Sequence, residues 1–402
     1  MVITKEKVKK ITVFMLALLL CLPGIFSPGR VQAQELSPAE ISSQAAVLME
    51  FSSGEIIFSK NGTERLPPAS LTKIMTLLLA HEALKQNKAT LTEEVTVSQN
   101  AWETGGSQMF LEIGQRVPFG TMLTGIATIS ANDACVAIGE HLYGSEAVFV
   151  QEMNKKAKTL GLEDTYFQNA SGLHHPEHYS SARDMACLAR YLIQNFPESL
   201  KLHSQIEFTF NGILQYNRNP LLGHYNGADG LKTGHTSQAG HCLIGTANQN
   251  GLRFITTVMN AASPAERKRD TETLLNYAFR NYTLHQAFPA GETIATAKVK
   301  SGEERSVDLY LEEPLEVAIP FNRQEDLDLQ IVVSENIVAP VQKGDSLGSV
   351  KVLLDGKTLD ETALHASKSI RKANVFSRFF RFIGDLLAGL WRQMAQVLRS
   401  FF

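Results

Sequence analysis

A serine and a lysine, Ser70 and Lys73, are the first residues in this sequence whose spacing suggests chemistry. They follow Pro67 and Pro68 and open an apolar run that predicts a helix over 70–83. Residues at this spacing lie on one helix face, so the hydroxyl and the amine can meet. A serine hydroxyl becomes a good nucleophile when a neighbouring base takes its proton. Lysine does this only when neutral, so its pKa must fall by roughly three units, about 4 kcal/mol, through burial or a second cation.

Two further segments extend the pattern. Ser130-Ala131-Asn132 follows an apolar run with helical character, and Lys232-Thr233-Gly234 follows an Asp-Gly turn and enters a predicted strand. Each alone is weak evidence, because Ser130 and Asn132 could cap a helix and Lys232 could be a solvated turn residue. The order Ser-x-x-Lys, Ser-x-Asn, Lys-Thr-Gly is, however, that of the penicillin-recognising serine enzymes.

On these motifs the chain resembles the low-molecular-mass penicillin-binding proteins, the serine-type D-alanyl-D-alanine carboxypeptidases of peptidase family S11. The resemblance covers nearly the whole chain after the first 34 residues. It implies an enzyme that removes the terminal D-alanine from peptidoglycan pentapeptides through an acyl-enzyme, and that β-lactams inhibit covalently. The segments that carry it are Pro68-Ala69-Ser70-Leu71-Thr72-Lys73, Gly105-Gly106-Ser107, Ser130-Ala131-Asn132-Asp133-Ala134, Asn169-Ala170-Ser171-Gly172-Leu173 and Asp229-Gly230-Leu231-Lys232-Thr233-Gly234-His235-Thr236.

The resemblance implies a catalytic group of three residues. Ser70 would be the nucleophile and Lys73 its base, and Ser130 would relay a proton to the leaving D-alanine. Asn132 would hold the amide on the acyl side of the scissile bond.

The resemblance also implies a substrate-binding group on the predicted strand. Lys232 would lower the pKa of Lys73 and attract the terminal carboxylate, to which Thr233 would donate a hydrogen bond. Gly234 completes the motif. The backbone N–H groups of His235 and the nucleophile would form the oxyanion hole, and Arg267 would be a further carboxylate-binding residue.

Other functions stay open at this point. A DD-endopeptidase would use the same motifs with a different groove. A β-lactamase is less favoured, because Glu163 and Asn169 lack the spacing of its deacylating loop. A non-catalytic penicillin-binding sensor would not need the intact motifs. The histidines within 174–178 lie in a predicted loop without a zinc-binding spacing, so no metal or organic cofactor is expected.

The N-terminus has the pattern of an export signal. Four lysines among the first ten residues precede an apolar stretch over 11–22, which is short for a membrane span. Val31-Gln32-Ala33 offers small residues for cleavage, so residues 1–34 are predicted to be a signal peptide, with an uncleaved anchor as the alternative. Export would place the enzyme at the outer face of the cytoplasmic membrane. The net charge of -3 argues against a nucleic-acid partner.

The length of 402 residues allows two domains. The resemblance implies that residues 35–283 form the peptidase domain, of α+β class and β-lactamase/transpeptidase-like. A mainly antiparallel sheet flanked by helices would be joined there to a helical lobe, with the site between them. Expected elements are a hairpin over 45–60, helices over 121–143, 145–160, 182–196 and 264–280, and strands over 206–210, 243–247 and 254–259.

Two smaller pieces follow. Residues 284–370 alternate valine and isoleucine between glycines, which predicts a β-sandwich-like domain with strands over 295–299, 306–311, 327–333 and 347–354. Residues 371–402 place Phe, Leu and Trp on one face of a predicted helix that also carries arginines. This is typical of an amphipathic helix on a membrane surface, and packing on the β domain is the alternative.

Overall fold

The computed structural model describes residues 36–374 and 391. Two folded regions follow one another along the chain: an N-terminal α+β domain, residues 37–281, and a C-terminal β domain, residues 282–373. The predicted signal peptide and nearly all of the predicted tail helix lie outside the described residues. None of the described helices has both the length and the apolar character needed to span a membrane.

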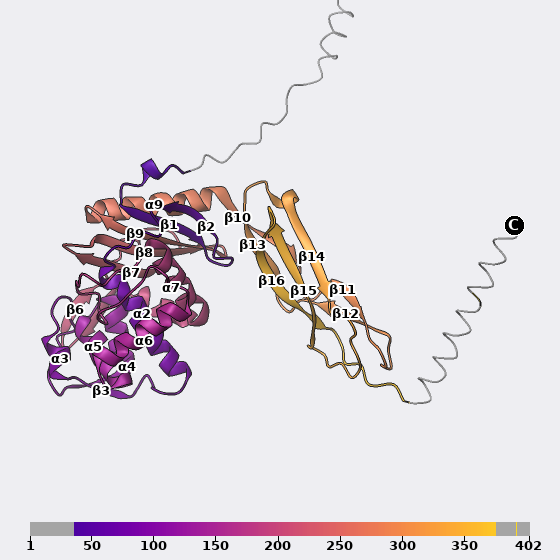
Figure 1. Ribbon diagram of the computed structural model, residues 1–402, viewed down its shortest axis with the longest axis horizontal. Coiled ribbons are helices and arrows are strands. Elements are labelled where there is room, and N and C mark those ends of the chain that lie inside the picture. The colour runs from indigo at the N-terminus through magenta and orange to yellow at the C-terminus, as the bar shows by residue number, and fades with distance from the viewer. Residues whose placement is uncertain (1–35, 375–390, 392–402) are drawn as a thin grey trace, which may run out of the picture. The chain divides into compact units, whose positions relative to one another are not determined.

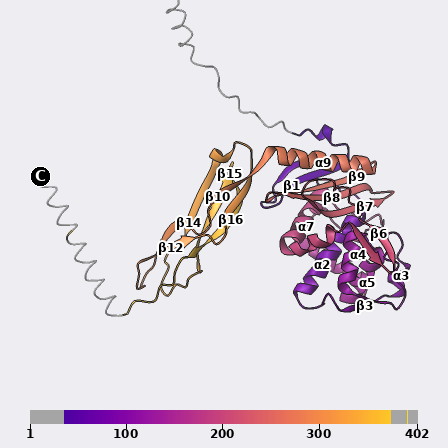
Figure 2. The ribbon, with the colours of Figure 1, turned by 180° about the vertical axis from the view of Figure 1, so that it is seen from behind.

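A five-stranded antiparallel sheet lies at the centre of the α+β domain. Its order is β2-β1-β9-β8-β7, so β7 is an edge strand. Helix α9 (Pro264–Asn281) packs on one face and α7 (Ala182–Asn195) on the other (Figure 1, Figure 2). The strands are β1 (Ala45–Glu50), β2 (Ile56–Lys60), β7 (Ala228–Thr236), β8 (Gly240–Gln249) and β9 (Leu252–Ala261).

A helical lobe lies on the α7 side of the sheet (Figure 1). Its helices are α2 (Lys73–Lys85), α3 (Gln99–Glu103), α4 (Phe119–Thr128), α5 (Asn132–Tyr143), α6 (Glu146–Thr159) and α8 (Leu200–His203). Short 3-10 turns and two hairpins complete the domain: η1 (Pro38–Glu40), η2 (Ala69–Thr72), η3 (Pro197–Ser199), β3 (Glu94–Thr96) with β4 (Arg116–Pro118), and β5 (Glu207–Phe210) with β6 (Ile213–Tyr216).

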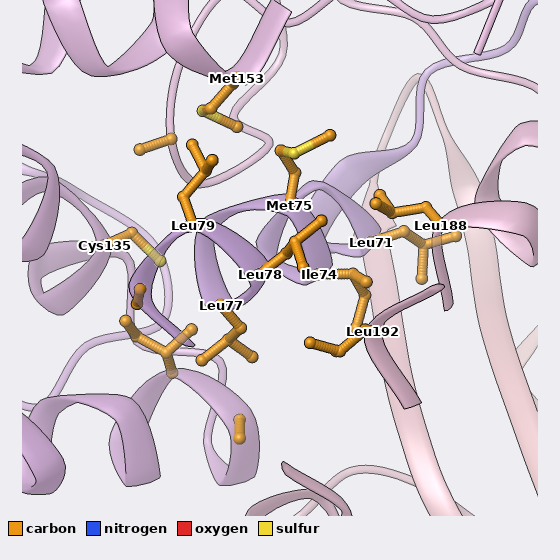
Figure 3. Close-up of a cluster of buried hydrophobic side chains, with 14 of the residues drawn as sticks. Leu71, Ile74, Met75, Leu77, Leu78, Leu79, Cys135, Met153, Leu188 and Leu192 are labelled. Carbon is orange, nitrogen blue, oxygen red and sulfur yellow. The ribbon is translucent and has the colours of Figure 1, made fainter. Parts of the chain in front are cut away.

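Helix α2 is apolar around most of its circumference, which is the pattern of a helix enclosed by others. Figure 3 shows its side chains pointing in several directions, toward Cys135 of α5, Met153 of α6 and Leu188 of α7. These side chains are all fully buried. Because neighbours hold α2 on all sides, the residues at its first turn have a fixed position.

The predicted helix over 121–143 is wrong as one element. Helix α4 ends at Thr128, α5 begins at Asn132, and Ser130 between them has a φ of 67°. A left-handed backbone cannot continue a right-handed helix. The apolar pattern hid the break because both helices are buried. The hairpin over 45–60 and the helices over 145–160, 182–196 and 264–280 are present as β1–β2, α6, α7 and α9.

The C-terminal β domain consists of two sheets around one apolar core. The predicted boundary at residue 284 falls inside β10, which pairs with β13 and therefore belongs to this domain. The second sheet has the order β11-β12-β16-β15-β14. The elements are β10 (Tyr282–Phe288), β11 (Ala295–Lys298), β12 (Ser306–Tyr310), β13 (Leu315–Pro320), η4 (Gln324–Asp326), β14 (Leu327–Val333), β15 (Ser346–Leu354) and β16 (Lys357–Ala366).

Candidate active site

Ser70 and Lys73 lie where the chain passes from the turn η2 into helix α2. The Lys73 Nζ is 2.8 Å from the Ser70 Oγ. It also donates a hydrogen bond to the main-chain oxygen of Ser171, at 2.6 Å. The two side chains therefore meet as their spacing predicts, and a neutral amine could take the hydroxyl proton along this contact.

The Lys73 side chain is completely buried. This burial is the main reason why its pKa falls from 10.5 to about 8, and the nearby positive charge of Arg218 lowers the pKa further. Cys135 and Asp133 act in the opposite direction. The environment thus makes a neutral amine accessible near neutral pH, which a serine nucleophile requires.

The segment Asn169-Ala170-Ser171-Gly172-Leu173 brings its backbone against the start of α2. The Asn169 Oδ1 accepts hydrogen bonds from the N–H groups of Ser171, Gly172 and Leu173. Gly172 has a φ of +87°, and a Cβ there would lie 1.8 Å from the Ala69 oxygen. Only glycine permits this approach, which delivers the Ser171 carbonyl to Lys73.

Strand β7 carries the Lys-Thr-Gly motif to the nucleophile from the sheet side. A Cβ on Gly234 would lie 3.1 Å from the Ser70 backbone nitrogen and 3.0 Å from the Pro68 oxygen. Lys232 and Thr233 are buried on the same strand. The ring of His235 stacks on His241 with a centroid separation of 4.2 Å.

Lys232 is the second buried amine of the site, and its Nζ donates to the Thr233 oxygen at 3.0 Å. Burial first, and then the charge of Lys73, lower the pKa of Lys232 well below its ordinary value. Because each ammonium disfavours the other, the site favours one cation beside one neutral amine.

Ser130 and Asn132 flank the break between α4 and α5, and both are buried. The Asn132 Nδ2 donates to the Gly105 oxygen at 2.7 Å, whereas its Oδ1 is buried without a partner in the described part of the chain. An unpaired buried amide oxygen is costly unless a ligand supplies a donor. The hydrogen bonds of Lys73 go to Ser70 and Ser171 rather than to Ser130.

Two arginines belong to the same electrostatic environment. Arg267, predicted from the sequence, is buried on α9 and lowers the pKa of Lys232. Arg218, which the sequence reasoning missed, lowers the pKa of both site lysines and donates to the Ser107 hydroxyl at 3.0 Å. It lies between β6 and β7, and no motif marks it in the sequence.

The histidine-rich segment has a structural contact with the site. The Gln168 N–H donates to the His178 Nδ1, so the Nε2 carries the proton and donates to the Thr72 hydroxyl at 2.8 Å. Burial lowers the pKa of His178 to about 3, which keeps the ring neutral. His174 and His175 are exposed. Among the described residues no group of His, Cys, Asp or Glu is arranged to hold a metal ion.

The geometry suits acyl transfer. A serine hydroxyl contacts a buried amine at the start of α2, which is the arrangement of an activated nucleophile. Buried cations lie on the β7 side, where they would attract a carboxylate.

Comparison with known proteins agrees with this geometry. The family model described as D-alanyl-D-alanine carboxypeptidase matches residues 32–263, and that described as penicillin-binding protein 5, C-terminal domain, matches residues 282–372. The D-alanyl-D-alanine carboxypeptidase DacF of Bacillus subtilis is 37% identical over 90% of this chain and 95% of its own.

Solved structures agree as well. Penicillin-binding protein 5 of Haemophilus influenzae is 36% identical, with a TM-score of 0.71 over 84% of this chain and 100% of that one. Penicillin-binding protein D2 of Listeria monocytogenes, solved in an ampicillin-bound form, is 34% identical, with a TM-score of 0.55 over 60% of this chain and 98% of that one. The chain therefore belongs to the D-alanyl-D-alanine carboxypeptidase family and is a serine carboxypeptidase of the S11 type.

Proposed function

We propose that Ser70 is the nucleophile with which this carboxypeptidase cleaves the terminal D-Ala-D-Ala bond of peptidoglycan pentapeptides. The observation that carries the assignment is the 2.8 Å contact between the Ser70 Oγ and the buried amine of Lys73. Burial supplies the lowered pKa of that amine. The Ser70 N–H would be one donor to the oxyanion.

The reaction proceeds in two balanced halves. The Ser70 oxygen attacks the carbonyl carbon of the penultimate D-alanine while Lys73 takes the hydroxyl proton. The N–H groups of Ser70 and His235 hold the tetrahedral oxyanion. Its collapse breaks the C–N bond, and Ser130 passes a proton from Lys73 to the leaving amine. Water then hydrolyses the ester, which returns the proton to the Ser70 oxygen and releases the shortened peptide.

The leaving D-alanine carries the terminal carboxylate, which has to be recognised on the β7 side. Lys232 and Arg267 supply positive charge there, and Thr233 supplies a hydroxyl on the same strand. Arg218 adds a third cation. A peptide with a free C-terminal carboxylate, the substrate of a carboxypeptidase, would satisfy these groups.

β-Lactams would acylate the same serine. The Listeria relative was solved in an ampicillin-bound form, which supports β-lactam binding in this family. Glu163 is exposed, and the Asn169 Oδ1 is already bonded to three backbone N–H groups. Neither side chain is placed to activate a deacylating water. The penicilloyl adduct should therefore be long-lived, unlike that of a β-lactamase.

Mass spectrometry of the intact protein after benzylpenicillin treatment tests the assignment, together with product analysis on a pentapeptide. The expected result is one adduct on Ser70 and release of one D-alanine. Ser70→Ala should lose both, whereas Ser369→Ala, an exposed serine of the C-terminal β domain, should keep both. An adduct that forms equally well on Ser70→Ala would overturn the proposal.

We propose in addition that the enzyme works outside the cytoplasmic membrane, attached to its surface. The proposal rests on sequence: the lysine-rich, apolar N-terminus of an export signal, and the arginines interleaved with Phe, Leu and Trp over 376–399. The substrate also lies in the cell envelope, so an exported enzyme meets it there.

A further inference from the structure

A buried carboxylate, that of Asp133, lies beside the candidate active site and has no part in the reaction steps. It is the second residue of α5, directly after Asn132, and is only 1% exposed. Burial lowers the pKa of Lys73, and the charge of Asp133 acts against this shift, so it opposes the neutral base. An effect on the base therefore does not explain the carboxylate. Its contacts are with residues 105–111, which we call the glycine loop.

Asp133 accepts hydrogen bonds from backbone N–H groups. Met109 donates at 3.0 Å, Leu111 at 3.3 Å and Ala134 at 2.9 Å. Burial raises the pKa of Asp133, whereas its backbone donors lower it. Since a carboxylate only accepts, these donors indicate the ionised form. Phe110, between the two donors of the glycine loop, has a φ of 62°, so the chain curves around the carboxylate there.

The other end of the glycine loop contacts the neighbouring residue, Asn132. The Gly105 oxygen accepts from the Asn132 Nδ2 at 2.7 Å, and the Ser107 oxygen accepts from the Asn132 N–H at 2.7 Å. Gly106, between them, has a φ of +88°, and a Cβ there would lie 2.6 Å from the Nδ2. The glycine loop is therefore held by two successive residues of α5, one through its amide and one through its carboxylate.

The orientation of the Asn132 amide follows from this contact. The Gly105 oxygen can only accept, so it binds the Nδ2 and leaves the Oδ1. That oxygen is buried and has no partner in the described part of the chain. A buried amide oxygen requires a donor. In the role that the family resemblance gives to Asn132, this donor is the N–H of the penultimate D-alanine.

We infer that Asp133 is a positioning residue: by holding the glycine loop, it keeps the Asn132 amide turned so that its oxygen is left for the substrate N–H. Without the carboxylate, the glycine loop would lose two hydrogen bonds, and the Gly105 oxygen would no longer hold the Nδ2. The amide could then rotate and present a donor to a donor. The inference rests on the proposed function.

A pair of synthetic peptides measures the orientation of the amide. One is Nα,Nε-diacetyl-lysyl-D-Ala-D-Ala. The other has D-lactate in place of the penultimate D-alanine, so an ester oxygen replaces the N–H that the Asn132 oxygen would accept. Both keep the scissile bond, and release of D-alanine gives kcat/KM for each. The unaltered enzyme should prefer the amide peptide by about tenfold or more, as expected for one buried hydrogen bond.

Asp133→Asn keeps the size of the side chain but replaces one acceptor oxygen with a group that only donates. It should lower kcat/KM by about tenfold for the amide peptide and by less than about twofold for the ester peptide, which does not use the Asn132 oxygen. Asp184→Asn is the matched control. Asp184 is also a buried carboxylate in the first turn of a helix, but it accepts from the Asp164 N–H, outside the glycine loop. This control should keep the preference for the amide peptide.

Gly106→Ala displaces the same amide without altering the buried charge, so it decides the question if Asp133→Asn does not fold. Its Cβ would collide with the Asn132 Nδ2, and the loss should again be confined to the amide peptide. Gly114→Ala is its control, because Gly114 also has a positive φ, of 78°, but no atom within 4 Å of the added Cβ. Both variants carry the backbone strain, and only Gly106→Ala should change the preference.

Each outcome bears on the inference. Loss of the preference in Asp133→Asn and Gly106→Ala, with both controls retaining it, supports the positioning role. An equal fall in kcat/KM for the two peptides would mean that Asp133 only stabilises the fold, and would overturn the inference. Equal cleavage of the two peptides by the unaltered enzyme would overturn it as well, but would leave the peptidase assignment intact. If the unaltered enzyme cleaved neither peptide, the proposed function itself would be refuted.

Discussion

At the scale of single residues, the site depends on two buried amines, those of Lys73 and Lys232. Burial is the main cause that lowers the pKa of each, and the charge of Lys73 lowers the pKa of Lys232 further. Burial, rather than a dedicated acidic partner, makes Lys73 a base. Enzymes elsewhere tune catalytic lysines in the same way.

The first prediction concerns pH. Since burial lowers the pKa of Lys73 to about 8, its amine is mostly protonated below that pH and neutral above it. The rate of acylation by benzylpenicillin should therefore rise with pH, by about tenfold per unit on the acidic limb, and level off above about pH 8. Stopped-flow measurements of adduct formation would follow this directly.

Lys73→Arg serves as the comparison, because a guanidinium stays protonated throughout the range. The acylation rate of this variant should fall by about a thousandfold, and its pH profile should no longer show the rise on the acidic side. A flat profile for the unaltered enzyme between about pH 6 and about pH 9 would rule out the amine as the titrating base.

A second prediction isolates Arg218. Its positive charge helps to lower the pKa of Lys73, so Arg218→Gln should raise that pKa. The acidic limb of the acylation profile should then move to higher pH by a few tenths of a unit or more, as the loss of one nearby charge in a partly screened site implies. Arg116→Gln, which removes an exposed arginine paired with Glu94, should leave the profile in place. Identical profiles for both variants would contradict the electrostatic role of Arg218.

At the scale of elements, several backbones converge on the start of α2. Gly172, between α6 and α7, approaches the backbone of Ala69 too closely for a side chain, and Gly234 of β7 approaches the backbone of Pro68 and Ser70 so closely that a side chain would be tight. The site is therefore positioned by main chain as much as by side chains, and glycine marks each point of approach.

Gly172→Ala tests this positioning against a matched glycine. Both Gly172 and Gly161 have a positive φ, but only at Gly172 would a Cβ collide with another backbone. Gly161→Ala should cost about 1 kcal/mol of unfolding free energy and leave acylation intact. Gly172→Ala should also lower the acylation rate, by at least about tenfold, because the Ser171 carbonyl is displaced from Lys73. Thermal unfolding and adduct formation separate the two effects. Equal acylation rates in the two variants would show that the close approach is unimportant.

Elements with a strong local signal were predictable from the sequence. The helix that begins near Ser70 and the hairpin over 45–60 have periodicity or turn residues that indicate them. The strand that carries Lys232 is present as β7, but the predicted Asp-Gly turn before it is wrong, because Asp229 and Gly230 lie within the strand at a register shift. The break at Ser130 was missed because two buried helices in sequence give one continuous apolar pattern. Strand β13 was missed because its partner β10 is distant in sequence. Strand β16 was missed although it forms a hairpin with β15 across Asp355-Gly356, which is a hairpin signal.

The candidate site likewise has features that follow from local sequence and features that only the tertiary fold creates. The contact between Ser70 and Lys73 follows from helical spacing alone, which is a local property. The arrangement of Lys232, Arg267 and Lys73 in one electrostatic environment depends on the tertiary fold, and only the family resemblance suggested it. Arg218 has neither a local signal nor a motif, so sequence reasoning could not find it.

At the scale of the whole molecule, chemistry and attachment are assigned to different parts of the chain. Every residue with a proposed catalytic or binding role lies between Ser70 and Arg267, within the N-terminal α+β domain. The C-terminal β domain contributes none of them. The tail can therefore be altered without touching the reacting groups, which makes membrane attachment and catalysis separable by experiment.

Truncation after Asn374 makes that test. The shortened enzyme should form the penicillin adduct at the full rate but no longer sediment with vesicles of phosphatidylglycerol and phosphatidylethanolamine. In the full-length enzyme, replacing Arg378 and Arg381 with glutamine should weaken binding to these anionic vesicles, because each basic residue near an anionic surface contributes about 1 kcal/mol. The binding that remains should depend less on salt concentration, because fewer charges take part in it. Replacing Phe379 and Phe380 with serine should weaken binding to neutral vesicles too, since apolar burial acts without charge. If the full-length enzyme fails to bind either vesicle while truncation lowers its unfolding temperature, the tail packs on the protein instead of the membrane.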